Sequence, residues 1–202
     1  MDNHQHNIII VGSGLVGMTL ALMLSRRKYK VLIFDKSSKK ELLGVKDSRT
    51  SAISQGSSRI LKELSIWNKI KNKAQPINEI YVSEGINSNE LAFKSEILNE
   101  GPLGYIVDNT YLKKIVFKEV LKSNFIKFIG GVNIKDIKST TGSATIFSNK
   151  GNFSAPLIVG ADGRNSKILQ SNVDGEYYKS KTPGVKSIGP PSILVNGKIV
   201  VC

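Results

Sequence analysis

The chain of 202 residues has very little of what builds disulfide frameworks and metal centres. Its single cysteine is Cys202, so no internal disulfide can form, and a reducing compartment is expected. Its two histidines, His4 and His6, lie in a short polar stretch at the N-terminus, where a frayed end explains them better than a metal site does. A disulfide-stapled domain and a zinc site are therefore both unsupported.

Arginine is also scarce, because 24 of the 29 basic residues are lysine and only 5 are arginine. The formal net charge of +13 would ordinarily suggest nucleic acid or an anionic membrane surface as a partner. Base readout and planar phosphate recognition favour arginine, and the lysines here are scattered or fall on helical spacing. We therefore expect no nucleic acid, and weak attraction to an anionic membrane is the better interpretation of the charge.

The sequence has one long apolar run, residues 8–24, which lacks the marks of a secretion signal or a membrane anchor. No basic residue precedes it, and no small-residue cleavage site follows Leu24. It is short for a membrane span, which takes about 20 residues, and three glycines interrupt it. We therefore expect a cytoplasmic chain without a spanning helix.

A glycine pattern stands directly after the apolar residues 8–11, in the order expected for a strand, a tight turn and a helix start. Gly12 would let the chain turn sharply, Gly14 would let the backbone approach a pyrophosphate, and Gly17 would let the helix pack closely on the strand. Free amides and the positive end of the helix dipole would then favour a phosphate group. The pattern predicts a dinucleotide site.

The residues that follow the glycines support this interpretation, which three glycines alone would not carry. A helix from Leu15 ends in the cations at 26–28, and residues 31–34 form the continuous apolar run typical of a buried parallel strand. Asp35 ends that strand about 20 residues beyond the glycines, where its carboxylate would accept hydrogen bonds from a ribose.

Beyond Asp35, the pattern predicts a mixture of parallel and antiparallel units. We expect a polar loop over 36–48, after which Arg49 and residues 50–54 lead into one helix through Trp67. Two short antiparallel strands should follow at 79–84 and 90–94, and then a helix that is capped by Asn109 or Thr110 and runs to Leu121. The last expected elements are a strand over 125–129, a β-meander between Val132 and Phe153, a strand before Asp162 and a short helix over 165–169. The fold class is α/β, with a Rossmann-like parallel central sheet and a small antiparallel β insertion.

The late segment Gly160-Ala161-Asp162-Gly163 gives a strand a glycine-rich exit. Asp162 and the neighbouring amides would lie at the carboxyl edge of the sheet, where open α/β sheets bind ligands. Taken alone, however, an Asp-Gly pair is ordinary turn chemistry.

In this order, the glycine turn, Asp35, Arg49-Thr50 before a helix, and residues 160–166 resemble the flavoprotein aromatic hydroxylases. Within that group the chain looks most like the ubiquinone-biosynthesis hydroxylases, which also carry the pattern seen here as Gly104-Tyr105-Ile106-Val107-Asp108-Asn109. The resemblance covers roughly residues 7–170.

The resemblance implies FAD as the cofactor, with NAD(P)H as co-substrate. Gly12, Gly14 and Gly17 would contact the FAD pyrophosphate, Asp35 the adenosine ribose, and Arg49 the flavin side. Asp162 and Gly163 would correspond to a motif associated with both FAD and the reduced nicotinamide. The full set of implied cofactor contacts is Gly12, Gly14, Leu15, Val16, Gly17, Asp35, Lys36, Arg49, Asp162 and Gly163. No catalytic side chain and no metal ligand is implied, because the cofactor carries the difficult chemistry.

Enzymes of this family use reduced FAD and O2 to hydroxylate an electron-rich ring. The related substrates are polyprenylated phenols, so the resemblance implies a lipid-phenol substrate and a peripheral contact at the inner membrane.

The chain also departs from the family pattern. It contains no Gly-Asp dipeptide, which the family carries as a third flavin motif, and only 39 residues follow Gly163. We therefore expect an incomplete FAD-binding domain over 1–170 and a divergent tail over 171–202, with a hairpin around Asn196-Gly197 and the substrate domain largely absent.

Three interpretations of the function remain open. One is a hydroxylase part that needs a complementary C-terminal chain, and another is an inactive nucleotide-binding remnant. The third is an NAD(P)-dependent dehydrogenase, which the long insertion after Asp35 disfavours.

Overall fold

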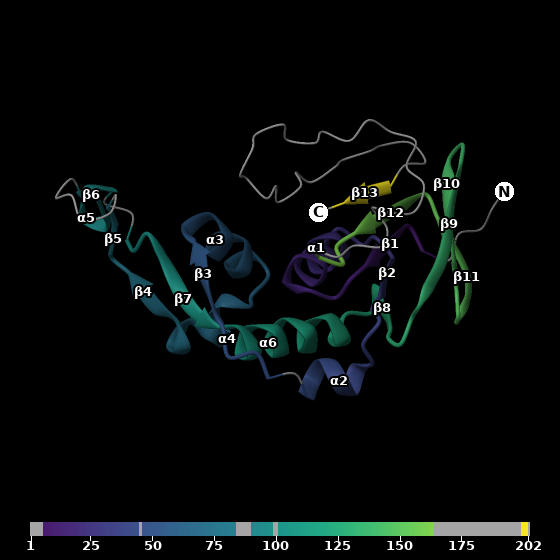
Figure 1. Ribbon diagram of the computed structural model, residues 1–202, viewed down its shortest axis with the longest axis horizontal. Coiled ribbons are helices and arrows are strands. Elements are labelled where there is room, and N and C mark those ends of the chain that lie inside the picture. Colours follow the sequence, from purple (N-terminus) through teal and green to yellow (C-terminus); the bar gives the residue numbers. More distant parts are fainter. Residues whose placement is uncertain (1–5, 45, 84–89, 99–100, 164–198, 202) are drawn as a thin grey trace. The chain divides into compact units, whose positions relative to one another are not determined.

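The computed structural model describes residues 6–44, 46–83, 90–98, 101–163 and 199–201 (Figure 1). The chain divides into two compact units, each described here by itself. Unit 1 comprises residues 1–44 and 116–202, and unit 2 comprises residues 45–115. The domain boundary expected at residue 170 and the short helix expected over 165–169 lie outside the described residues.

A five-stranded parallel sheet forms the centre of unit 1, with the strand order β13-β12-β1-β2-β8 (Figure 1). Its strands are β1 (Ile8–Val11), β2 (Val31–Phe34), β8 (Ile126–Ile129), β12 (Leu157–Gly160) and β13 (Ile199–Val201). Every residue of β1 and β2 is buried, as the continuous apolar runs predict for strands covered on both faces. The predicted α/β fold with a parallel central sheet is thereby confirmed. Of the hairpin expected around 196–197, the first arm and the turn lie outside the described residues.

Helix α1 (Leu15–Arg26) connects β1 to β2, and helix α2 (Lys39–Gly44) follows β2. The segment 36–48 was expected to be a loop throughout, so α2 corrects that prediction. The hydroxyl of Ser38 accepts from the Glu41 amide, and the Glu41 carboxylate accepts from the Ser38 amide. This reciprocal capping stabilises a short helix that buries no residue and therefore leaves no apolar period in the sequence.

The predicted β-meander packs against the parallel sheet within unit 1. It consists of β9 (Ile134–Thr140), β10 (Ser143–Ser148) and β11 (Gly151–Ala155), in the order β11-β10-β9. Phe153 meets the buried ring of Phe34 edge to face, with 4.9 Å between the ring centroids. The shared core also includes Ile9, Ile146 and Ile158, none of which is exposed.

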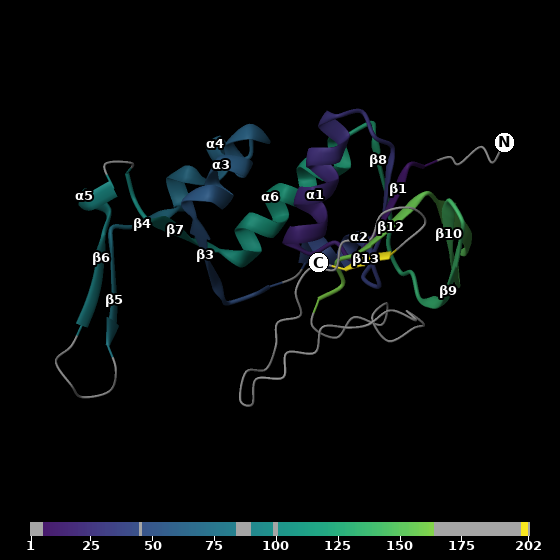
Figure 2. The ribbon, with the colours of Figure 1, turned by 90° about the horizontal axis from the view of Figure 1, so that it is seen from above.

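Unit 2 holds a three-stranded antiparallel sheet, a separate hairpin and short helices. Its elements are β3 (Thr50–Ser54), α3 (Gln55–Glu63), α4 (Trp67–Ile70), a 3-10 turn (Lys71–Lys73), β4 (Gln75–Ile77), β5 (Glu79–Ser83), β6 (Glu90–Lys94), α5 (Ser95–Leu98) and β7 (Gly104–Asp108). The sheet order is β3-β7-β4, and among the described residues β5 pairs with β6 alone (Figure 2). The two short antiparallel strands expected near 79–94 are thereby confirmed. Helix α6 (Asn109–Lys122) has residues in both units.

The helix expected to run through Trp67 is instead two helices, preceded by the unexpected strand β3. The break lies at Ser65, which adopts the left-handed backbone with φ of 59°. Leu64, Ile66 and Trp67 are all buried, and a continuous helix would direct Leu64 and Ile66 to opposite faces. The left-handed residue re-aims the chain so that all three side chains enter the core.

The start of α6 corrects a second detail. Neither Asn109 nor Thr110 caps this helix, because the Asp108 carboxylate accepts from the Tyr111 amide at 2.6 Å.

Nowhere in the described part of the chain is a helix long and apolar enough to cross a membrane.

Candidate nucleotide site

The turn after β1 requires glycine at its first position. Gly12 has a φ of +108°, and its amide donates to the Phe34 carbonyl at 2.7 Å. A Cβ there would lie 2.2 Å from the carbonyl oxygen of Ala161, so no other residue fits without moving backbone. The constraint comes from the segment that leaves β12, where the Ala161 amide donates to the Val11 carbonyl at 2.7 Å.

Gly17 allows helix α1 to lie directly against this turn. A Cβ at Gly17 would stand 2.1 Å from the Gly12 carbonyl oxygen and 3.3 Å from the Cβ of Ala161. The close approach is therefore between the first turn of the helix and the turn after β1, rather than along the strand. The first turn of α1 thus lies against the turn at the end of β1.

Gly14 differs from the other two glycines because the protein itself leaves room for a side chain there. Its backbone is extended, with φ of −67°, and a Cβ would meet only the Ala161 carbonyl oxygen, at 4.0 Å. Gly14 is also the N-cap of α1, so the N-cap residue has no side chain to cap the helix, and the first turn holds no acidic residue. The N-cap residue therefore leaves the first-turn amides to another acceptor, as suits a helix that binds an anionic group.

Asp35 lies beside the same turn and is tied to it. Its Oδ2 accepts from the Ser13 amide at 2.7 Å and from the Ser13 hydroxyl at 2.5 Å, while Oδ1 accepts from the Ser37 amide at 2.8 Å. A carboxylate has about four acceptor positions, so one on Oδ1 is left for a ligand hydroxyl. Ser13 was not predicted as a site residue, although a serine within a glycine turn that faces an acid is a usable signal.

The parallel register brings three sequence-predicted segments to one sheet edge. Val11 pairs with both Phe34 and Gly160, so the turn at Gly12, the acid at Asp35 and the exit segment after β12 all begin at the same level. That exit includes Asp162 and Gly163, both exposed, and Gly163 has a φ of +84°. Lys36 is exposed next to Asp35, Leu15 is half-buried and Val16 is exposed in the first turn of α1. This carboxyl edge is where open α/β sheets bind ligands.

Arg49 belongs to unit 2, and its guanidinium is paired with Asp47. Nε lies 2.8 Å from Oδ1 and Nη2 lies 2.9 Å from Oδ2, a two-pronged contact. The Arg49 side chain is 78% exposed, while that of Asp47 is 9% exposed. The pairing holds the pKa of the Asp47 carboxyl well below its usual range and raises the pKa of Arg49.

Asp47 was missed by the sequence analysis, and it organises the segment around Arg49. Lys113 on α6 donates to Asp47 Oδ2 at 2.9 Å, and the backbone amide of Asp47 donates to the Thr110 hydroxyl at 2.7 Å. Thr110 in turn donates to the Asp47 carbonyl at 2.9 Å, and Asn109 contacts the Ser51 hydroxyl. These contacts use the Asn109 and Thr110 side chains, which explains why neither caps α6. The result is a fixed base for a guanidinium that faces solvent.

Comparison with known proteins identifies the family. The family model described as an FAD binding domain matches residues 5–184, which is most of the chain. The chain belongs to this FAD-binding family. The glycine turn, the uncapped first turn of α1 and the remaining acceptor position on Asp35 fit the adenosine diphosphate part of such a cofactor.

Two curated relatives have names that refer to ubiquinone, one as a hydroxylase and one as a biosynthesis monooxygenase. The ubiquinone hydroxylase UbiL of Rhodospirillum rubrum is 29% identical over 167 residues, which cover 82% of this chain and 39% of the relative. The mitochondrial ubiquinone biosynthesis monooxygenase COQ6 of Dictyostelium discoideum is 26% identical over 205 residues, covering 87% of this chain and 41% of the relative. The chain therefore spans about two fifths of the length of these relatives.

The fold is shared with a solved monooxygenase structure. The p-nitrophenol 4-monooxygenase PnpA of Pseudomonas putida superposes with a TM-score of 0.68 at 16% identity, covering 81% of this chain and 42% of that one. This similarity concerns the fold alone.

Proposed function

We propose that the chain binds FAD through unit 1 and takes part in hydroxylating the ring of a polyprenyl phenol in ubiquinone biosynthesis, with NAD(P)H and O2 as co-substrates. The observation that carries the FAD assignment is the contrast among the glycines. Gly12 and Gly17 are required by the protein's own backbone, whereas Gly14 is not. A glycine in open space at an uncapped helix start is explained by the close approach of a ligand.

The residues of this chain would bind and orient the cofactor. The first-turn amides from Leu15 to Gly17 would hold the pyrophosphate, and Asp35 would accept a hydroxyl of the adenosine ribose. Arg49, fixed by Asp47, would serve the flavin side, and Asp162 and Gly163 would lie along the nucleotide. When bound, FAD supplies the redox chemistry, so the chain needs no catalytic acid or metal of its own.

The proposal includes a complementary polypeptide. We propose that the ring-binding surface lies in the C-terminal part of a hydroxylase and that a second, complementary chain supplies it; the chain spans about two fifths of the length of the relatives. Polyprenyl phenols reside in membranes, and the net charge of +13 supports peripheral attraction to an anionic inner-membrane surface.

FAD titration of the purified chain tests the assignment most directly. We expect saturable binding with a change in the flavin absorption spectrum, and no binding by Gly14→Val, whose side chain would occupy the pyrophosphate position. Gly44→Val is the matched control, because a Cβ at Gly44 meets nothing within 4 Å and the residue lies at the end of α2. This control should bind FAD as the unmodified chain does.

The other outcomes contradict the proposal in distinct ways. Stoichiometric NAD(H) binding without flavin would indicate a nicotinamide-dependent dehydrogenase. A folded chain that binds neither nucleotide would be a remnant of the family. Equal FAD affinity in the unmodified chain and in Gly14→Val would remove the pyrophosphate assignment itself.

A further inference from the structure

Ser13 occupies one oxygen of the Asp35 carboxylate completely. Its backbone amide donates to Oδ2 at 2.7 Å, and its hydroxyl donates to the same oxygen at 2.5 Å. An ionised carboxylate oxygen has about two acceptor positions, so Oδ2 has none left for a ligand. Ser13 is only 4% exposed, so the protein itself encloses this pair of hydrogen bonds.

The other oxygen of Asp35, Oδ1, keeps a single acceptor position. The Ser37 amide donates to Oδ1 at 2.8 Å and takes the other position. Ser13 belongs to the turn after β1 and Ser37 to the segment after β2, so two parts of the chain fix the orientation of the carboxylate. A ligand that reaches Asp35 therefore finds one acceptor position rather than two.

The turn that carries Ser13 is held in place at the level of Asp35. The Gly12 amide donates to the Phe34 carbonyl at 2.7 Å, and a Cβ at Gly12 would overlap the Ala161 carbonyl. The parallel pairing of Val11 with Phe34 sets the height of the turn relative to Asp35. Because the Ser13 amide is committed to the carboxylate, a pyrophosphate is left with the amides further along α1.

We propose that Ser13 is a positioning residue for the nucleotide: by occupying Oδ2, it restricts Asp35 to one hydrogen bond with the adenosine ribose, accepted by Oδ1. A ribose presents two neighbouring hydroxyls, and a carboxylate with both oxygens free can accept from both. Here the 2′-hydroxyl, which an acid at this position binds, takes the place on Oδ1, and the 3′-hydroxyl makes no bond to Asp35. The inference rests on the proposed function, because it requires the nucleotide at this edge of the sheet.

Competition with bound FAD measures how many ribose hydroxyls Asp35 recognises. ADP, 2′-deoxy-ADP and 3′-deoxy-ADP are titrated against the full chain loaded with FAD, and flavin fluorescence reports displacement. We expect 2′-deoxy-ADP to bind at least about tenfold more weakly than ADP, because it loses a hydrogen bond to a charged group. The affinity of 3′-deoxy-ADP should equal that of ADP.

Ser13→Ala distinguishes a positioning role from a role in folding. Alanine keeps the backbone amide on Oδ2 but frees the second acceptor position of that oxygen, so both ribose hydroxyls can bind the carboxylate. In this variant 3′-deoxy-ADP should also bind more weakly than ADP. A purely structural role of the hydroxyl would weaken all three nucleotides by the same factor and leave their ratios unchanged.

Ser37→Ala is the matched control for Ser13→Ala. Ser37 donates to Asp35 through its backbone amide, which alanine keeps. The three nucleotides should therefore bind this variant with the same ratios of affinity as they bind the unmodified chain.

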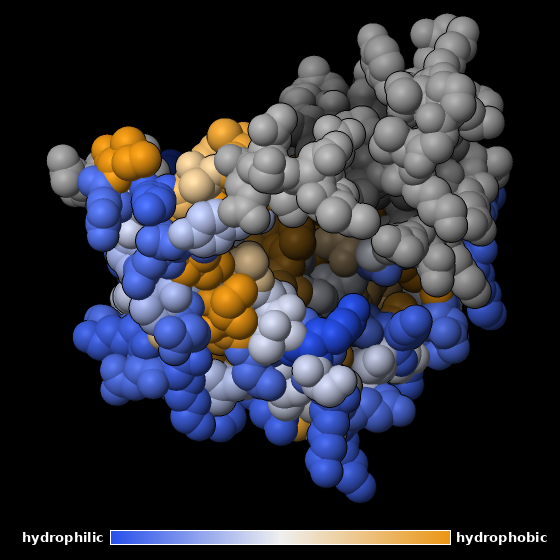
Figure 3. Space-filling model, turned by 60° about the vertical axis from the view of Figure 1, so that its left-hand side comes forward, coloured by the Kyte–Doolittle hydropathy of each residue, from blue (hydrophilic) through white to orange (hydrophobic). Residues whose placement is uncertain are grey.

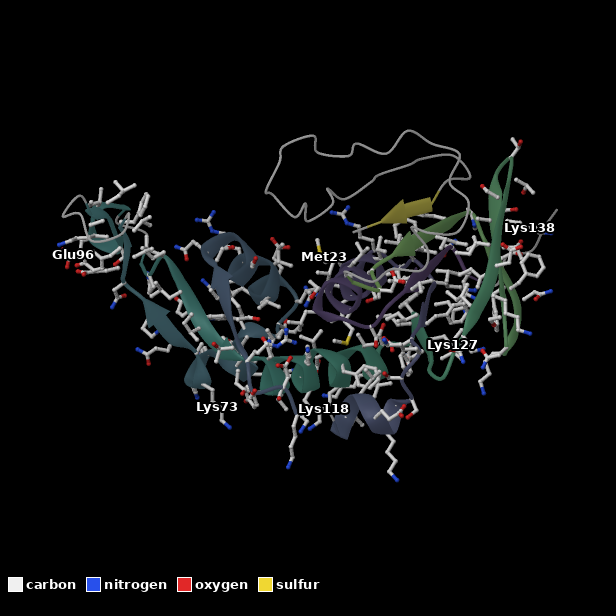
Figure 4. The ribbon with its side chains drawn as sticks, viewed as in Figure 1. Met23, Lys73, Glu96, Lys118, Lys127 and Lys138 are labelled. Carbon is white, nitrogen blue, oxygen red and sulfur yellow. The ribbon has the colours of Figure 1, made fainter. Side chains whose placement is uncertain are left out.

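Asp35→Asn tests whether the carboxylate is the group that recognises the ribose. The amide nitrogen of asparagine carries hydrogens and cannot accept, so the weaker binding of 2′-deoxy-ADP relative to ADP should be lost. Hydrophilic residues occupy much of the face that Figure 3 shows, and Glu96 is exposed on α5 of unit 2 (Figure 4). Glu96→Gln makes the same change of charge outside unit 1 and should preserve the ratios.

The outcomes distinguish this inference from the proposed function. If FAD does not bind, both are wrong. If FAD binds and the unmodified chain discriminates equally against both deoxynucleotides, the FAD assignment stands and recognition of a single hydroxyl is wrong. If it discriminates against neither, Asp35 makes no ribose contact, which also overturns the inference. Unchanged ratios in Ser13→Ala would show that Ser13 does not set the number of hydroxyls recognised.

Discussion

Strands β1 and β2 of unit 1 and strands β5 and β6 of unit 2 are built from similar apolar residues but end in different surroundings. Every side chain of β1 and β2 is buried, because helix α1, the meander and neighbouring strands cover the parallel sheet. The hairpin residues alternate between two faces, and the apolar face is about half exposed. A continuous apolar run and an alternating one therefore have different meanings: the first requires cover on both faces, and the second on one.

The comparison is tested most strongly by truncating one phenylalanine in each region. Phe34 is fully buried and meets Phe153, so Phe34→Ala should lower the free energy of unfolding by about 3 to 5 kcal/mol. Phe93 is half-exposed on the hairpin, so Phe93→Ala should cost less than about 1 kcal/mol. Urea denaturation followed by circular dichroism, at a low protein concentration, measures both changes.

The outcome that contradicts this comparison is specific. If Phe93→Ala lowers the free energy of unfolding as much as Phe34→Ala does, the hairpin face has a cover within the monomer, and its exposure would not describe the chain in solution.

A second pair of variants compares two helical glycines. Alanine normally stabilises a helix interior over glycine by up to about 1 kcal/mol. Gly56→Ala in α3 of unit 2 should show part of that gain, since a Cβ there meets only Ser54 Oγ, at 4.0 Å. Gly17→Ala should instead cost about 3 kcal/mol, because its Cβ would overlap a backbone carbonyl. Thermal and urea unfolding measure whether each variant has a higher or lower free energy of unfolding than the unmodified chain. A stabilised Gly17→Ala would disprove the tight contact.

The same contrast explains what the sequence could predict. The order β1, α1 and β2 rests on local patterns: continuous apolar strands, glycines at fixed spacing, and an acid at the second strand's end. The meander followed from alternation and from turns at Gly142 and Asn149 to Gly151. In each case the neighbours that matter are close in the sequence, or the pattern itself demands cover on a known face.

The missed features depend on distant contacts. Asp47 is one of many acids in polar segments, and only the fold brings Lys113 and Thr110 to it. Ser65 breaks a helix because the residues on both sides of it must be buried, which the sequence does not show. Ser13 stood inside a recognised motif, but its bond to Asp35 needed the two strands placed in register.

The ionised Asp47 carboxylate is expected to make the stability of unit 2 depend on pH. The carboxyl group has a lower pKa in the folded chain than in the unfolded chain, chiefly because Arg49 and Lys113 donate to it. It therefore adds stability above the ordinary aspartate pKa of about 3.9, and that stability is lost as the pH falls further toward the depressed value. The effect should be smaller than that of Phe34→Ala, because Arg49 is exposed to solvent.

Asp47→Asn provides the comparison for this pH dependence. Above about pH 5 the variant should be less stable than the unmodified chain by a constant amount, and the two stabilities should converge as the pH falls below about 4. Urea midpoints measured from above about pH 5 down to well below about pH 4 test the sign of this change in stability. Parallel profiles at all pH values would show that the carboxylate contributes nothing through its charge.

A substitution at Gly14 should change stability least. It also separates an effect on folding from an effect on binding most clearly. Its extended backbone suits an N-cap residue, and serine is a better cap than glycine by a few tenths of a kcal/mol. Gly14→Ser should therefore leave stability unchanged or slightly raised. The new hydroxyl would accept from the same first-turn amides that are proposed to hold the pyrophosphate, and the Cβ would fill the space left for it.

We accordingly expect Gly14→Ser to be folded, at least as stable as the unmodified chain, and weakened at least about tenfold in FAD affinity. Gly44→Ser, at the open end of α2, is the matched control and should change neither property. If Gly14→Ser lost stability and affinity together, Gly14 would be a structural glycine like Gly17, and its open surroundings would carry no information about a ligand. If it kept full affinity, the phosphates would lie elsewhere along the carboxyl edge, and the exit segment at Asp162 and Gly163 would become the next place to locate them.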